Sequence, residues 1–133
     1  RGADMAYESP GIDIGTLTAA ADLSSKQYYF VKLASATTVN VCTAITDKPI
    51  GVLQNTPTTG QAATIRIFGV SKMSANGTIA FSNPLGTSAD GQADAYTPGT
   101  HTTVYACGQA IEAAASAGDL FSAFINLTNA RMA

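Results

Sequence analysis

The residue types that most often carry catalysis are sparse in this sequence. It contains one histidine, His101, which follows Pro98-Gly99 and lies between two threonines. Serine and aspartate are plentiful, so a Ser–His–Asp triad is arithmetically possible. Nothing resembles the Gly-x-Ser-x-Gly nucleophile elbow or a glycine run that would build an oxyanion hole. We therefore expect His101 to be an exposed loop residue, and a hydrolase built around it is the least favoured function.

Patterns that bind metal ions or phosphates are equally weak. A zinc site needs three or four His, Cys or acidic ligands, whereas this chain offers one histidine and two widely separated cysteines. Asp90 and Asp94 lie four residues apart in a turn-like segment, but a calcium loop needs further oxygen ligands and a late glutamate. Glycine-rich phosphate-binding loops are also missing. The sequence predicts no catalytic residue, no metal site and no cofactor, and the protein is not expected to be an enzyme.

The two cysteines each fall within an apparent strand, Cys42 in residues 39–43 and Cys107 in residues 104–107. Two cysteines do not make a disulfide framework. We expect both to be small buried side chains with free thiols. A single disulfide between them is the alternative.

Length and charge limit the remaining classes of protein. The 133 residues suffice for one domain, and 46% of them are hydrophobic, which favours a folded chain over disorder. Seven basic and nine acidic side chains give a net charge of −2. Nucleic-acid binding depends on clustered Lys and Arg, so no nucleic-acid partner is expected. No apolar run approaches the ~18 residues that span a membrane, so no membrane partner is expected either.

From Lys26 onward the sequence is rich in β-branched and aromatic residues, which are typical of strands. Asn76-Gly77 is a strong signal for a two-residue hairpin turn. Residues 111–116 are rich in alanine, and the sequence leaves open whether they form a helical turn or a strand. Short strands separated by turns predict an all-β fold, a small single-domain β-barrel or sandwich. The expected strands are residues 27–33, 36–44, 49–53, 63–73, 78–81, 102–110 and 120–127.

Residues 1–24 differ from the rest of the chain. They carry four acidic residues and one arginine, and proline and glycine interrupt any regular pattern. Their few apolar side chains cannot form a core, so we interpret the segment as an extended N-terminal arm on a β domain of residues 25–133. A frayed terminus is the alternative. An arm that becomes ordered on a neighbouring molecule would use its apolar side chains, which are Tyr7, Ile12, Ile14 and Leu17.

Several short motifs follow one another in order between Tyr28 and Leu127. They are Pro49-Ile50-Gly51-Val52-Leu53-Gln54-Asn55, Gly60 with Ala63, Gly69-Val70-Ser71-Lys72, residues 85–93, and residues 108–114 with 117–119. Together these motifs resemble the small capsid decoration (cement) proteins of tailed bacteriophages. The resemblance implies a β-barrel-like domain in the virion, on the outer surface of an icosahedral head. It implies no catalytic residues.

The same resemblance implies partners and a mechanical role. Such proteins bind where subunits of the major capsid protein meet, and they hold the shell against the pressure of packaged DNA. They commonly associate with themselves as homotrimers, and sometimes as dimers or act as monomers. This chain is therefore expected to bind the major capsid protein and further copies of itself.

Two regions are candidates for contact with the capsid. The arm is expected to be the main tether, so that deletion of residues 1–24 leaves a folded domain that no longer binds heads. The second region is an uncharged loop that would suit a flat interface, with an ordinary connector as the alternative. Phe68 and Tyr105 are expected either in the core or as anchors for self-association. The loop candidates are Gln54, Asn55, Thr56, Pro57, Thr58 and Thr59.

Two other functions stay open on the sequence alone. One is a different virion part, a tail or head-completion ring protein, because such proteins also use small β-barrels. The other is a carbohydrate-binding or adhesive β domain. The chain contains no Trp, and the lack of this residue disfavours a sugar-binding groove.

Overall fold

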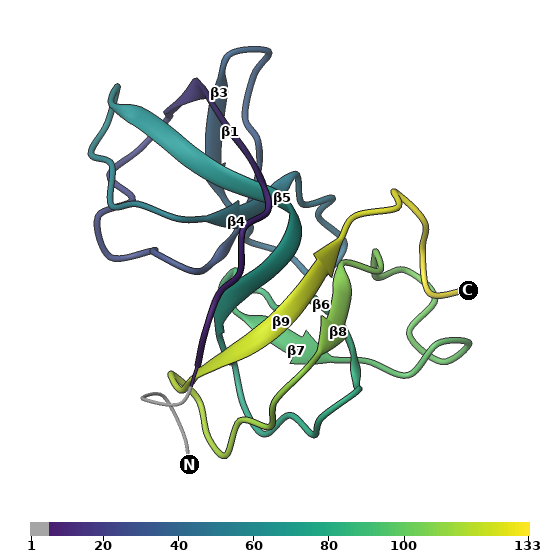
Figure 1. Ribbon diagram of the computed structural model, residues 1–133. Coiled ribbons are helices and arrows are strands. Elements are labelled where there is room, and N and C mark those ends of the chain that lie inside the picture. The colour runs from purple at the N-terminus through teal and green to yellow at the C-terminus, as the bar shows by residue number, and fades with distance from the viewer. Residues whose placement is uncertain (1–5) are drawn as a thin grey trace.

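The protein is built from short strands in one mixed sheet. A computed structural model describes residues 6–133 (Figure 1), and residues 1–5 of the predicted arm lie outside the described part. Residues 6–133 contain no helix, and so none long and apolar enough to cross a membrane. The nine strands are β1 (Ile12–Ala19), β2 (Phe30–Leu33), β3 (Thr38–Val41), β4 (Gly51–Leu53), β5 (Ala62–Ser74), β6 (Pro84–Thr87), β7 (Ala93–Ala95), β8 (Gly108–Ala110) and β9 (Leu120–Asn126).

Five strands form a closed ring of pairings in one half of the molecule, which we call the barrel lobe. The hydrogen-bonded order β1–β3–β2–β4–β5 returns to its start because β1 also pairs with β5. β1 and β3 run parallel, and the other pairings of the ring are antiparallel. Side chains alternate across a strand, so each strand sends one set into a shared core. That core contains Leu23, Val31, Val39, Leu53 and Ile65.

The other half is an antiparallel sheet in the order β5–β9–β8–β6–β7, which we call the second lobe. Its core includes Met73, Phe121 and Ile125, all fully buried. Phe30 of β2 belongs to the same core, and its amide donates to the carbonyl oxygen of Gly91 at 2.7 Å. The two lobes therefore share side chains across their junction and form one folded unit.

β5 runs through both lobes. Its first half pairs with β1 and β4, and its second half pairs with β9. The strand curves strongly between the two halves (Figure 1). Gly69 lies in this bend with a φ of 114°, and a Cβ atom there would meet the Cα atom of Gly11 at 2.9 Å. Glycine at position 69 therefore allows both the bend and the close crossing of the N-terminal segment.

The predicted all-β fold is confirmed, although most strands are shorter than the sequence indicates. The most regular pattern is the most accurate, since the strand predicted at 63–73 is observed at Ala62–Ser74. The strand predicted at 102–110 is reduced to Gly108–Ala110, with Tyr105 forming an isolated bridge to Arg131.

The structure also decides two local questions in the second lobe, the hairpin predicted at Asn76-Gly77 and the conformation of residues 111–116. The hairpin predicted at Asn76-Gly77 is wrong, because β9 takes the place beside β5 that the returning strand would have occupied. The chain leaves the sheet after β5, and Ile79 forms an isolated bridge with Ala114. Residues 111–116, whose structure the sequence left open, are not helical.

The predicted N-terminal arm is partly a strand of the β domain itself. Residues 12–19 form β1, where Thr18 pairs with Thr38 of β3 and Leu17 pairs with Ala63 of β5. Leu23 is buried in the barrel core. The division of the chain at residue 24 is therefore corrected: the segment is extended, but the partners of its strand belong to the same chain. Deletion of residues 1–24 would remove a strand of the barrel lobe.

Candidate interaction surfaces

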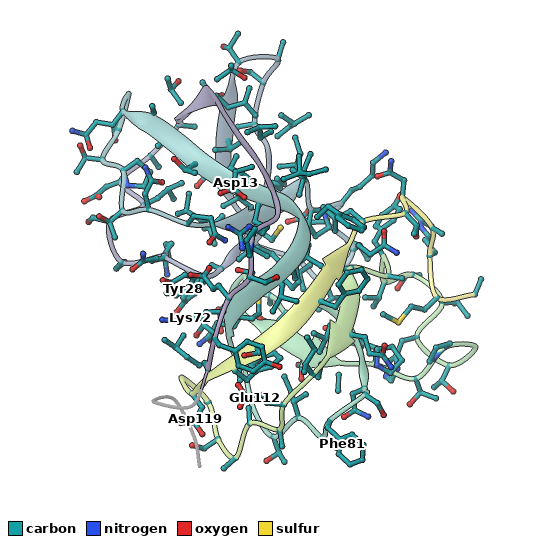
Figure 2. The ribbon with its side chains drawn as sticks, in the orientation of Figure 1. Asp13, Tyr28, Lys72, Phe81, Glu112 and Asp119 are labelled. Carbon is teal, nitrogen blue, oxygen red and sulfur yellow. The ribbon has the colours of Figure 1, made fainter. Side chains whose placement is uncertain are left out.

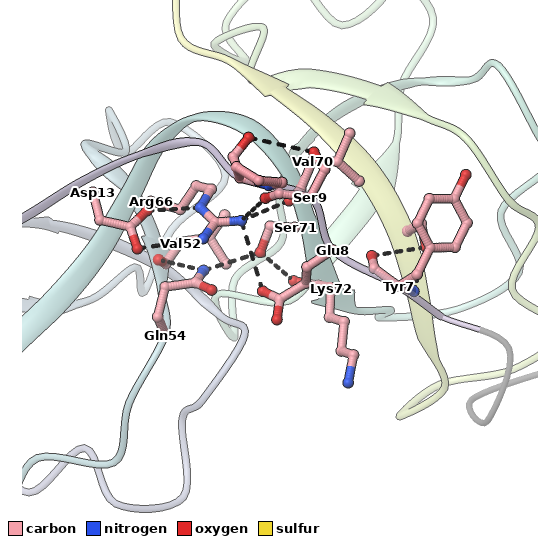
Figure 3. A network of polar contacts seen from close by, with 12 residues as sticks. Tyr7, Glu8, Ser9, Asp13, Val52, Gln54, Arg66, Val70, Ser71 and Lys72 are labelled. Carbon is pink, nitrogen blue, oxygen red and sulfur yellow. Dashed lines mark hydrogen bonds and ion pairs between the residues drawn. The ribbon is translucent and has the colours of Figure 1, made fainter.

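The N-terminal segment is fixed across β5 by the guanidinium of Arg66 (Figure 3). Its Nε donates to Asp13 Oδ1 at 2.6 Å and its Nη2 donates to Oδ2 at 3.3 Å, which makes a two-point ion pair. Its Nη1 donates to the carbonyl oxygens of Ser9 and Val70 at 3.0 and 2.7 Å. Glu8 places a carboxylate oxygen 3.9 Å from the same nitrogen. The hydrogen bond to Asp13 raises the pKa of Arg66.

A buried hydroxyl holds the start of the same segment. Ser122 of β9 is fully buried, and its Oγ accepts a hydrogen bond from the Tyr7 amide at 2.7 Å. The same Oγ lies 3.0 Å from the Tyr7 carbonyl oxygen and 2.9 Å from Glu112 Oε1. A hydroxyl has one hydrogen, so it donates to one of these two oxygens at a time. The Tyr7 backbone is thus held while its side chain points outward.

The four candidate residues of the arm divide into two pairs. Ile14 and Leu17 are half-buried against the barrel core, so part of their apolar surface is used within the chain. Tyr7 and Ile12 are 46% and 56% exposed. Contact between any of the four and a neighbouring molecule stays a prediction.

Ile12 is part of an exposed apolar area on β1, β5 and β9. It pairs with Phe68 across β1 and β5, and Phe68 is 44% exposed. The Phe68 ring packs edge-on against the half-buried Phe124 of β9, with the ring centroids 5.3 Å apart. We call Ile12, Phe68 and Phe124 the apolar face. Core burial of Phe68, one of its two expected placements, is therefore excluded, and neighbouring exposed apolar groups of this kind are typical of interaction sites.

The loop predicted as a second contact region turns half of its side chains inward. The side-chain nitrogen of Gln54, Nε2, donates to Ser71 Oγ at 2.9 Å and to the Val52 carbonyl oxygen at 3.1 Å. The Asn55 side chain bonds the backbone of β5 on both of its polar atoms, and Pro57 is buried. Thr56, Thr58 and Thr59 are exposed. These three threonines, which we call the threonine tip, are the part of the loop that faces outward.

Comparison with known proteins gives a result at the level of the fold. No protein-family model matches the sequence, and no curated protein is significantly similar to it. Several solved structures resemble the chain, and two of them illustrate the similarity. One is the N base of the head fiber gp8.5 of bacteriophage phi29, with a TM-score of 0.63 and 18% identity over 86% of this chain and 93% of that one. The other comes from the capsid of Myoviridae phage XM1, with a TM-score of 0.62 and 15% identity over 89% of this chain and 84% of that one.

The chain has a fold found in phage heads. This finding confirms the fold that the motif resemblance to phage decoration proteins implies. The identities are low, so the similarity concerns the backbone arrangement and carries over no individual contact residue.

Residues with potential chemistry lie apart from the apolar face. His101 is exposed, its Nδ1 accepts a hydrogen bond from the Thr97 amide at 2.8 Å, and its ring packs against Tyr96. Asp94 accepts a hydrogen bond from the Asn76 side chain at 3.1 Å. No group of three or more His, Cys, Asp and Glu residues suited to a metal ion occurs within residues 6–133.

Arg66 and Ser122, the two side chains that hold the N-terminal segment, were not predicted as functional residues from the sequence. Arg66 lies in a strand whose apolar and polar residues alternate, and this pattern predicts an ordinary solvent-facing side chain at position 66. The available signal was the excess of acidic residues in the first 24 positions, which indicates a basic partner. Ser122 lies within an apolar strand, and nothing in its neighbours indicates that it binds a segment 115 positions away.

Proposed function

We propose that this protein is a non-enzymatic structural part of a phage virion, which binds the outer surface of an icosahedral head where capsid subunits meet. The observation that carries the proposal is the backbone similarity to two phage head proteins over 86% and 89% of the chain. In this role it stabilises the shell against internal DNA pressure. The major capsid protein is its partner, and it also associates with itself as a homotrimer or dimer.

The surface of the protein supports this role. The apolar face presents Ile12 and Phe68 at 56% and 44% exposure, and the threonine tip adds uncharged polar groups at the end of the barrel lobe. A molecule that bridges several shell subunits does not need a tight contact with each, because linked weak contacts reinforce one another. It stabilises the assembled shell because it binds that state and not the dispersed subunits.

We infer that the apolar face and Tyr7 form the contact with the shell. Polar contacts hold the N-terminal backbone in place, so Tyr7 and Ile12 are displayed without a large loss of conformational freedom on binding. Ile14 and Leu17 support this surface from the barrel core. The threonine tip is supported in the same way by the inward-facing side chains of its loop, which are Gln54, Asn55 and Pro57.

The experiment uses heads of the phage that encodes the chain, prepared without the protein. Wild-type protein is added, and bound protein is measured by co-sedimentation and located by electron cryomicroscopy. Phe68→Asp should weaken binding by about 30-fold or more, the loss typical of a central aromatic anchor. Ile45→Asp is the matched control, because Ile45 is 40% exposed and lies outside the apolar face.

The thermal stability of the heads gives a second measurement. Decorated heads should release their DNA at a higher temperature than bare heads, and the Phe68→Asp variant should not provide this protection. Surface density at subunit junctions supports the proposal. Full binding by the Phe68→Asp variant would refute the apolar face as the contact, and no binding by folded wild-type protein would refute the function.

The similarity to the phi29 head-fiber base favours a second candidate, the attachment base of a fiber. Images of complete virions separate the two candidates, because heads given only this chain lack any fiber that it would carry. A cement protein gives compact density of its own size at many junctions, whereas a fiber base carries an extended projection.

A further inference from the structure

The second lobe carries the most exposed large apolar side chain of the described residues. Phe81 is 71% exposed, and Figure 2 places it at the end of the second lobe that points away from the barrel lobe. It lies in the turn formed by residues 80–83. Phe81 does not belong to the apolar face, whose three residues lie on β1, β5 and β9.

The turn holds Phe81 in a fixed position. The Ala80 amide donates to Asn83 Oδ1 at 2.9 Å, and the Asn83 amide donates back to the Ala80 carbonyl oxygen at 3.2 Å. The Ser82 amide donates to the Ala110 carbonyl oxygen at 2.7 Å. Ser82 has a φ of 64°, a conformation that a non-glycine residue keeps only where its surroundings impose it. A side chain held in this way loses little conformational entropy when it binds.

A pocket of complementary character lies in the barrel lobe. Its volume is about 460 Å³, and its apolar wall comes from Leu33, Pro49 and Ile50. Lys32, Lys48 and Asn129 complete its lining. Lys32 is paired with Asp47 at 2.9 Å, and the Lys48 ammonium lies over the Tyr105 ring, 6.0 Å from its centre. Lys48 thus already contacts one aromatic ring, and an ammonium group beside an apolar pocket attracts a further ring.

We propose that Phe81 of one copy inserts into the Leu33–Pro49–Ile50 pocket of a second copy. Residues 78–83 carry no charge, so burying this turn removes no ion from water. The ring fills an apolar pocket, and Lys48 adds a cation–π contact. Because Phe81 and the pocket lie in different lobes, the contact is either made twice in a two-fold dimer or made head-to-tail, and head-to-tail contacts build closed rings when the rotation between copies closes. This inference names the surfaces that join copies and does not require the capsid.

The first test is the oligomeric state of the purified full chain, measured by sedimentation velocity over a range of concentrations. Wild type should form a discrete oligomer, and Phe81→Ser should raise its dissociation constant by about 30-fold or more, as for the loss of an aromatic anchor. The matched control is Ile12→Ser, since Ile12 is similarly exposed at 56% but lies on the apolar face. The control should retain the wild-type oligomer. Thermal unfolding of each variant verifies that the fold is intact.

A second test identifies the two surfaces directly. An Ala80→Cys variant is mixed with an Ala34→Cys variant and treated with a short bis-maleimide; both positions are exposed neighbours of Phe81 and Leu33, so the ring and the pocket wall stay in place. The natural thiols of Cys42 and Cys107 are buried, so the introduced thiols react first. A cross-linked dimer should form between the two variants, and it should not form when Thr16→Cys replaces Ala34→Cys.

Several outcomes overturn the inference. One is a wild-type protein that is monomeric at every concentration, and another is an unchanged oligomer in the Phe81→Ser variant. Cross-linking of the Ala80→Cys variant to itself would show that the Phe81 turns of two copies meet each other and not the pocket. Weaker head binding by Phe81→Ser, with no change in self-association, would assign the ring to the capsid protein instead.

Discussion

Arg66 contacts oxygen atoms from the N-terminal segment and from its own strand. The segment it holds buries little apolar surface near its start, since Tyr7 and Ile12, the first residue of β1, are 46% and 56% exposed. Polar contacts to Asp13, Ser9 and Ser122 therefore fix its position. The Arg66 side chain is only 12% exposed, whereas that of Asp13 is 33% exposed, so the ion pair between them is partly open to water.

Replacement of Arg66 by methionine should lower the free energy of unfolding by about 2 kcal/mol, because the carbonyl oxygens of Ser9 and Val70 lose their charged donor. Urea titration measures this change. Arg131→Met is the matched control, because Arg131 is exposed and its guanidinium contacts the Tyr105 ring at 5.1 Å, a surface contact worth at most about 1 kcal/mol. Equal stability of both variants would show that the guanidinium contacts contribute nothing net.

Among the strands, β1 has partners on both sides, β3 on one edge and β5 on the other. It closes the barrel lobe and leaves no free edge there. Residues 6–11, which precede it, lie across the outer surface. The predicted arm thus contains two parts with different structural roles, a short outer segment and a barrel strand.

Two truncations separate these parts. Deletion of residues 1–9 should leave a cooperatively folded protein, less stable by about 1–3 kcal/mol because the bonds to Ser122 and Arg66 are lost. Deletion of residues 1–24 removes β1 and the buried Leu23, and should abolish cooperative unfolding. Circular dichroism during heating distinguishes the two. A sharp transition in the longer truncation would mean that the other strands close the barrel without β1.

The bend of β5 gives a second prediction at this scale. Gly69→Ala should cost about 1–3 kcal/mol, because alanine rarely adopts a positive φ and its Cβ atom would meet Gly11. Gly77→Ala is the matched control, since nothing lies within 4 Å of a Cβ atom there. Its effect on the midpoint of denaturation should be small. Similar midpoints for both variants would contradict the close crossing.

How much of this structure follows from the sequence depends on how local each signal is. The alternation of residues 63–73 is a local pattern, and the strand is present almost as predicted. The assignment of residues 12–19 to an arm failed, because the partners of β1 are the distant residues 38–39 and 62–68. Asn76-Gly77 misled for the same reason, since the choice of β9 as the neighbour of β5 is a long-range decision. Phe81 is a further example, because the turn that exposes it depends on Ala110.

In the molecule as a whole, the two lobes meet around a shared core that contains both cysteines. Cys42 belongs to the barrel side and Cys107 to the second lobe, and both are fully buried members of one cluster with free thiols. The predicted free thiols are thus confirmed. Burial raises the pKa of the Cys42 thiol to about 12. Burial, and to a smaller extent the neighbouring Cys42, also raise the pKa of the Cys107 thiol.

Thiol reactivity therefore reports on opening of the junction. At pH 8 both thiols should react with a maleimide at least about 1,000-fold more slowly than a free cysteine, because reaction requires unfolding. Both should become reactive together in urea. Above pH 9, the ordinary pKa of the thiol, the unfolded chain loses protons that the folded chain retains, so stability should fall as the pH rises. Fast labelling of one cysteine in native protein would show that the junction opens locally.

The course of β5 through both lobes has a mechanical consequence. A force that pulls the N-terminal segment along β1 acts parallel to the β1–β5 pairing, so its hydrogen bonds are loaded together in shear and not broken one by one. The load then passes along a single continuous backbone into the β5–β9 pairing. Tension applied at one end of this molecule is thus carried to the other by strand pairing, without relying on the packing between the lobes.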